Sequence, residues 1–171
     1  GRLIVGVGLG WMPEEFAAMG ADYGQRGTMT DEQIELFKAL CTQERPSYRG
    51  RHFATDGMTF FPRPLQQPHP PIWIGGNSEA ALRRTARLGD AWHGIRLAPA
   101  QIPAQQAKLA QLCADHGRDP DQVQVTLRCT LALGTAQRDS EGQRVPLTGT
   151  VGEIRQDLRA FRESGLDYLV L

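Results

Sequence analysis

The sequence predicts an α/β fold in which parallel strands are joined by crossover helices. Short apolar runs alternate with helical patterns along most of the 171 residues. Apolar residues make up 40% of the chain, which is enough for one sizeable core. We therefore expect a single domain over residues 1–171, with strands near residues 3–8, 72–75, 91–93, 123–129 and 168–171.

Four helices are predicted from signals at their ends. Two capping-box patterns, in which a Thr is followed three residues later by Gln or Glu, are expected to open helices at Thr30 and Thr150. The other two helices are expected over residues 78–88 and 105–116. Glycines follow these two helices and the helix that begins at Thr150, as is typical of a C-terminal stop.

Residues 46–70 interrupt the alternation of strands and helices. Aromatic and polar residues are interleaved around Gly57, which indicates a small hairpin with its turn at this glycine. Prolines then gather from Pro62 to Pro71. Because proline fixes φ, this stretch is expected to form an extended lead into the next strand.

From the charge balance we expect no nucleic-acid or membrane partner, although a local charged patch is still compatible with it. Nineteen basic residues match nineteen acidic ones, so no net field attracts the chain to nucleic acid or to an anionic membrane. We find no apolar run near the ~20 residues that cross a bilayer and no signal-peptide pattern, and we expect a cytoplasmic protein. Cys41, Cys113 and Cys129 are far apart in the sequence, so we expect core cysteines and no metal site.

Residues 70–78, PPIWIGGNS, are the most informative segment. A short apolar run ends in Gly75 and Gly76 and is followed by the helix-capping residues Asn77 and Ser78. Glycine lets the backbone approach a ligand closely, and the free N–H groups of a first helical turn can bind a phosphate. An ordinary strand-to-helix turn has the same pattern, so the residues alone leave both interpretations open.

The run from Gly6 to Trp11 is close to a dinucleotide-binding fingerprint but fails it. The spacing is G-x-G-x-G, and Trp11 stands where the third glycine of GxGxxG is required. Either a ligand or a neighbouring loop would fill the space beside Gly8 and Gly10. Trp11 would form one wall of a pocket or cover the edge of the fold.

His93 stands at the C-terminal end of a predicted strand, the edge at which parallel sheets hold their ligands. It would act as a proton donor, as a hydrogen-bond partner for a cofactor, or as a structural residue. Arg128 ends another predicted strand and would face a ligand or form a salt bridge at the edge of the sheet.

Several segments together resemble the luciferase-like flavin monooxygenase family, in particular its branch that uses the deazaflavin coenzyme F420. The matching stretches are residues 2–16, 26–32, 64–78, 81–93 and 148–171. The resemblance implies a (β/α)8 TIM-type barrel. Both ends of the chain fall in strand-like runs, and a closed barrel typically needs ~250 residues. We therefore expect an incomplete barrel, from about its fourth strand to its eighth, with the first three βα units absent from this chain.

The same resemblance implies FMN or coenzyme F420 as cofactor, held over the C-terminal mouth of the barrel. The implied function is an oxidoreductase of the monooxygenase type that acts on a small organic substrate and forms a homodimer. From its place at a strand end, His93 is the candidate catalytic residue, and no metal is expected. The alternatives are a non-catalytic flavin-binding or dimer-forming relative and a sugar-phosphate enzyme without a redox cofactor. The residues expected at the cofactor are Gly8, Gly10, Trp11, Gly75, Gly76, Asn77 and Ser78.

Overall fold

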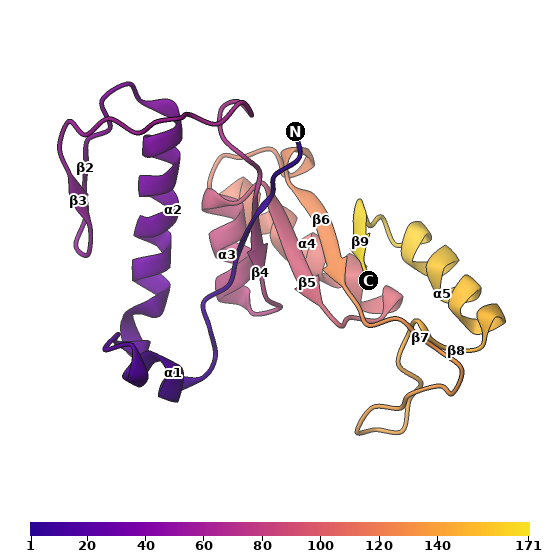
Figure 1. Cartoon of the computed structure of the whole chain (residues 1–171). Coiled ribbons are helices and arrows are strands. Elements are labelled where there is room, and N and C mark those ends of the chain that lie inside the picture. The colour runs from indigo at the N-terminus through magenta and orange to yellow at the C-terminus, as the bar shows by residue number, and fades with distance from the viewer. The chain divides into compact units, whose positions relative to one another are not determined.

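The computed structural model describes all 171 residues, which form two compact units, Gly1–Ile72 and Trp73–Leu171 (Figure 1). The elements of the first unit are β1 (Val5–Val7), α1 (Pro13–Ala18), a 3-10 turn (Tyr23–Gln25), α2 (Arg26–Thr42), β2 (Tyr48–Arg49) and β3 (Ala54–Thr55).

The helix predicted to open at Thr30 begins earlier. In α2 the first residue is Arg26, and Thr30 lies buried inside the helix, so the capping box predicted there was wrong. The 3-10 turn before it is capped by the Asp22 side chain and runs directly into α2. Arg26 holds this junction, because its guanidinium donates to the carbonyl of Tyr23 at 2.6 Å and stacks 3.6 Å over the Tyr23 ring.

The predicted hairpin between residues 46 and 70 is confirmed, with a different turn. β2 and β3 pair antiparallel, and the turn between them closes with a 2.8 Å bond from Gly50 N–H to the carbonyl of Phe53. Gly57 lies beyond the hairpin. Within the first unit, the turn is fastened to α2 by the carboxylate of Glu32, which accepts three backbone N–H groups, those of Arg51, His52 and Phe53.

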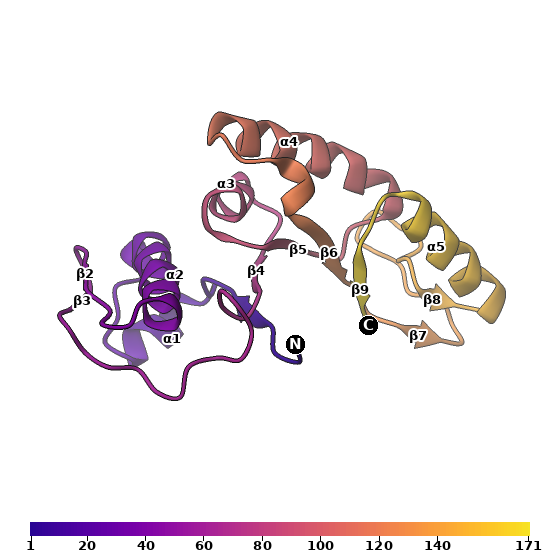
Figure 2. The same cartoon turned by 90° about the horizontal axis from the view of Figure 1, so that it is seen from above.

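The second unit contains the parallel sheet that the sequence predicts. Strands β4, β5, β6 and β9 lie side by side in this order, and every pair is parallel. Figure 2 shows α3, α4 and α5 on the same face of these strands. The α/β prediction with a parallel sheet is confirmed, whereas the incomplete (β/α)8 barrel stays a prediction. The elements are β4 (Ile72–Gly75), α3 (Glu79–Leu88), β5 (Ala91–Ile95), α4 (Ile102–Asp115), β6 (Gln124–Arg128), β7 (Ala132–Leu133), β8 (Thr148–Gly149), α5 (Val151–Glu163) and β9 (Tyr168–Val170).

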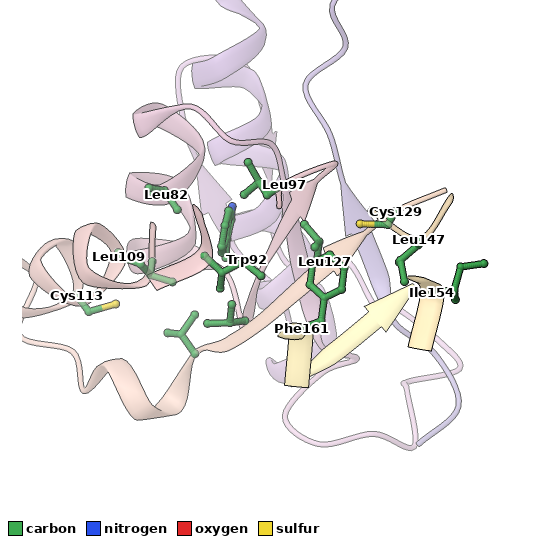
Figure 3. Close-up of a cluster of buried hydrophobic side chains, with 14 residues drawn as sticks. Leu82, Trp92, Leu97, Leu109, Cys113, Leu127, Cys129, Leu147, Ile154 and Phe161 are labelled. Carbon is green, nitrogen blue, oxygen red and sulfur yellow. The ribbon is translucent and has the colours of Figure 1, made fainter. Parts of the chain in front are cut away.

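The core of this unit lies between the sheet and its three helices. Trp92 of β5 and Leu127 of β6 are completely buried, as is Leu82 of α3 (Figure 3). Leu109 of α4 and Phe161 of α5 complete the same cluster. Cys113 and Cys129 also belong to it, so both are core residues as predicted.

The predicted ends of α3 and α5 are confirmed. The side chain of Ser78 accepts the N–H of Ala81 and caps α3. Thr150 and Glu153 form a reciprocal capping box at α5. No helix of the chain is long and apolar enough to cross a membrane.

A buried ion pair holds the loop that precedes α5. Asp157 of α5 is 8% exposed and accepts two bonds from the guanidinium of Arg144, at 2.5 and 2.9 Å. The same carboxylate accepts the N–H of Leu147 at 2.7 Å. Leu147 is fully buried and has a φ of 65°, a left-handed conformation that is uncommon for leucine. The carboxylate of Asp157 therefore pairs with the charge of Arg144 and also holds the backbone of the loop at Leu147.

Candidate functional site

The glycine pair after Trp73 forms the junction between β4 and α3. Gly76 has a φ of 122°, which side-chain-bearing residues rarely adopt, and an added Cβ would lie 3.3 Å from the Cβ of Ala81. Its N–H donates to the carbonyl of His93 at 3.1 Å. Asn77 and Ser78 are exposed, so no side chain of the unit covers this corner. The corner is at the carboxyl end of β4, the edge where parallel α/β folds bind ligands.

Neighbouring residues hold this junction rigidly. The side-chain amide of Asn77 makes two bonds to the backbone of Ile95, accepting its N–H at 2.9 Å and donating to its carbonyl at 2.8 Å. The indole N–H of Trp92 donates to the carbonyl of Gly76 at 2.7 Å. Since its side chain is used in this way, Asn77 could contact an anion only through its backbone N–H.

The first turn of α3 can receive an anion. The N–H groups of Ser78, Glu79 and Ala80 have no acceptor inside the helix because they precede its first hydrogen-bonded turn. The hydroxyl of Ser78 accepts one N–H and still has its own proton to donate. Glu79 is the one acidic residue in this turn, and Arg83 pairs with it at 2.7 Å. Together with the positive end of the helix dipole, these groups suit a phosphate.

His93 lies one strand away in the same register. Gly75, His93, Thr126 and Tyr168 are successive Cα partners across β4, β5, β6 and β9. The ring of His93 lies 5.4 Å from that of Trp73, tilted by 34°. Burial and then the charge of Arg128 lower the pKa of His93. The structure thus brings together His93 and the predicted loop of residues 75–78.

A positively charged edge adjoins this loop. Arg96, with a φ of 53°, donates its backbone N–H to the carbonyl of Arg128 at 2.9 Å. Both arginines line a small cavity of about 60 Å³, and Arg96 also lines one of about 300 Å³ with Leu97 and Cys129. Neither arginine forms an ion pair with a carboxylate, so this edge favours anionic ligands. Sequence reasoning missed Arg96, whose left-handed backbone at the end of β5 is a property of the fold.

Gly8, Gly10 and Trp11 lie in the other unit, after β1. An added Cβ at Gly8 would meet no atom within 4 Å, whereas at Gly10 it would lie 2.8 Å from the ring of Phe16. Gly10 also has a φ of 78°. The packing against Phe16 is thus sufficient reason for a glycine at position 10. Trp11 is 77% exposed, and its carbonyl accepts the hydroxyl of Tyr23 at 3.3 Å. All three stay predicted cofactor contacts.

The sequence did not predict Thr126 and Tyr168 as residues of the site. Each lies on the face of the sheet opposite the three helices, where Thr126 binds His93 and Tyr168 packs against Trp73 with ring centroids 5.4 Å apart. Only the pairing of β5 with β6 and of β6 with β9 places them beside the predicted residues. No group of three or more metal-ligating side chains is positioned to hold an ion.

Two solved structures share this fold. An F420-dependent secondary alcohol dehydrogenase in complex with an F420-acetone adduct aligns with a TM-score of 0.82 at 16% identity, covering 100% of this chain and 64% of that one. The monooxygenase RslO1 from Streptomyces bottropensis aligns with a TM-score of 0.77 at 20% identity, covering 99% and 60%. At these identities the likeness shows the fold alone. This chain spans less than two thirds of the length of both proteins.

Comparison of sequences shows the family. An FMNH2-dependent dimethylsulfone monooxygenase from Pseudomonas putida is 36% identical over 96 residues, which are 54% of this chain and 26% of that protein. An uncharacterized protein from Mycobacterium tuberculosis is 38% identical over 93 residues, 54% of this chain and 33% of that one. The model of the luciferase-like monooxygenase family matches residues 1–143. The chain therefore belongs to the luciferase-like monooxygenase family.

Proposed function

We propose that this chain binds the phosphate of reduced FMN or of coenzyme F420 at the loop of residues 75–78, as part of an oxidoreductase of the monooxygenase type. The observation that carries the proposal is the exposed first turn of α3 at the carboxyl edge of the sheet. Relatives described as FMNH2-dependent and F420-dependent support the choice of cofactor. The substrate would be a small organic molecule.

The residues of the loop fit a phosphate. The backbone N–H groups of Ser78, Glu79 and Ala80 and the Ser78 hydroxyl supply donors, and Gly76 lets the chain turn without a side chain. Arg96 and Arg128 add positive charge at the same edge of the sheet. Once bound, the cofactor would supply hydride transfer or oxygen activation, and the protein would position it and restrict access of water. A homodimer in the cytoplasm stays our expectation for the assembly.

Two matched substitutions at Ser78 test the phosphate site. Both Asp and Asn are good N-cap residues, so Ser78→Asp and Ser78→Asn should keep α3 capped and leave the melting temperature nearly unchanged. Only Asp adds a negative charge beside the expected phosphate. At ~4 Å such repulsion costs at least about 1 kcal/mol per pair of unit charges. We expect FMN and F420, titrated by fluorescence, to bind Ser78→Asp about tenfold or more weakly, and Ser78→Asn within about threefold of the wild type.

Riboflavin, which lacks the phosphate, is the second control. It should bind the wild type more weakly than FMN and should not distinguish Ser78→Asp from Ser78→Asn. The proposal fails if FMN and riboflavin bind equally, if the added carboxylate leaves FMN binding unchanged, or if neither FMN nor F420 binds the chain. Turnover of reduced cofactor with an acceptor or oxygen then separates an enzyme from a relative that only binds flavin.

A further inference from the structure

One hydrogen bond determines which ring nitrogen of His93 is protonated. Nδ1 of His93 lies 2.8 Å from the hydroxyl oxygen of Thr126, and that oxygen lies 2.8 Å from the carbonyl of Trp92. A carbonyl can only accept, so the single hydroxyl proton of Thr126 is donated to Trp92. Thr126 is fully buried, so its hydroxyl has no access to water as an alternative partner. The remaining bond requires Nδ1 of His93 to donate to Thr126.

The second ring nitrogen, Nε2, then carries a lone pair. Burial and then the charge of Arg128 lower the pKa of His93, which favours the neutral ring. The partner of Nδ1 is a hydroxyl oxygen, which favours an imidazolium less than a carboxylate would. The ring of Trp73 packs beside that of His93, with the planes tilted by 34°. With Nδ1–H bound to Thr126, a neutral His93 is suited to accept a hydrogen bond at Nε2.

We propose that His93 presents Nε2 as a hydrogen-bond acceptor to an N–H or O–H group of the bound ligand, and that Thr126 is the positioning residue that fixes this tautomer. The proposal rests on the proposed function, because His93 is the Cα partner of Gly75 at the phosphate loop. Adjacent strands are about 4.8 Å apart, so the ligand that places its phosphate at the loop passes near the ring. The acceptor would select a ring imide N–H of the cofactor or a hydroxyl of the substrate over a carbonyl or a carboxylate.

The tautomer can be tested on the free chain without any cofactor. Long-range proton–nitrogen NMR correlation distinguishes a protonated from an unprotonated imidazole nitrogen. We expect Nδ1 of His93 to be protonated in the wild type at pH 7.5. Thr126→Val keeps the shape of the side chain but removes the hydroxyl, and it should give a mixture of tautomers, whereas Thr126→Ser should restore the wild-type spectrum. Protonation at Nε2 in the wild type, or an unchanged spectrum in Thr126→Val, would overturn the assignment.

The source of the donor is tested with two flavins. FMN and N3-methyl-FMN differ only in the imide N–H, so roughly a two- to tenfold weaker binding of the methylated form, absent in His93→Phe, would identify the cofactor as donor. A substrate hydroxyl would be the donor if FMN and N3-methyl-FMN bind equally and the Nε2 resonance shifts only when 2-propanol is added to the FMN complex. If FMN binds but Nε2 responds to neither ligand, the acceptor role fails while the phosphate site stands. If FMN does not bind, the proposed function fails, and the tautomer measured on the free chain is unaffected.

Discussion

Removal of the Asp157 side chain should be among the most destabilising single changes in the second unit. Asp157→Ala leaves the guanidinium of Arg144, whose side chain is 26% exposed, without its carboxylate partner. It also leaves the N–H of Leu147, a fully buried residue, without an acceptor. In the variant Arg144 keeps its 2.8 Å bond to the carbonyl of Thr148 and lies 3.9 Å from Glu153, but it and the N–H of Leu147 both lose the carboxylate that replaced water on folding. Removing one partner in this way is the costly way to break a buried contact.

The expected loss follows from these two groups. Breaking a buried ion pair by deleting one partner costs about 3 to 5 kcal/mol, and the partial exposure of Arg144 favours the lower end. An unsatisfied buried N–H adds about 1 kcal/mol. We therefore expect the free energy of unfolding to fall by about 4 kcal/mol, and the melting temperature by roughly 8 to 16 °C for a chain of this size.

Urea unfolding followed by tryptophan fluorescence measures this loss. The control is the double variant Arg144→Met with Asp157→Asn, which contains no charge at this place and keeps an amide oxygen for the N–H of Leu147. It should lose only about 1 kcal/mol, since replacing both ions of a buried pair is nearly neutral. If Asp157→Ala unfolds within about 0.5 kcal/mol of the wild type, or if the double variant is as unstable as the single one, the pair does not hold the loop.

Three further outcomes are expected. Because burial and Arg128 lower the pKa of His93, the unfolded state binds the proton more readily than the folded state. The free energy of unfolding should therefore decrease as the pH falls below the ordinary pKa of 6.5. Urea titrations at several pH values should show a smaller decrease for His93→Asn. Burial raises the pKa of Cys129 to about 11, so at pH 8 the thiolate fraction of Cys129 is roughly 100-fold smaller than that of a free thiol. Cys129 in the native protein should therefore react slowly with a disulfide reagent, and the reaction should become fast when urea is added. Gly76→Ala should lower the free energy of unfolding by about 1 to 3 kcal/mol, because residue 76 has a positive φ. Gly8→Ala, where an added Cβ has open space, should be as stable as the wild type. Equal stabilities of the two variants would refute the role of the turn.

Local signals were sufficient where the relevant partners are close in sequence. The capping box at Thr150 and the cap at Ser78 each involve residues within three positions, and both are present. The same pattern at Thr30 failed because a contact outside the pattern, the stacking of Arg26 on Tyr23, starts the helix one turn earlier. The pattern of hydrophobic residues also predicted the parallel strands, since each is an apolar run between helical segments.

The candidate site could be predicted only in part. The glycine pair and the cap are adjacent in sequence, so residues 75–78 could be recognised directly. The bond between His93 and Thr126 joins residues 33 positions apart and depends on the register of β5 and β6. The local sequence does not predict the tautomer of His93 or the left-handed backbone of Arg96, because both depend on how the strands are aligned.

The attachment of Asn77 to Ile95 has a consequence for how relatives can diverge. Asn77 grips only main-chain atoms of Ile95, whose side chain is 40% exposed. Any residue with a backbone N–H could therefore occupy position 95 and keep both bonds to Asn77. Proline, which has no backbone N–H, would remove the bond to the Asn77 side-chain oxygen. The side chain at position 95 can therefore change without disturbing the turn, whereas a change of Asn77 would remove both bonds.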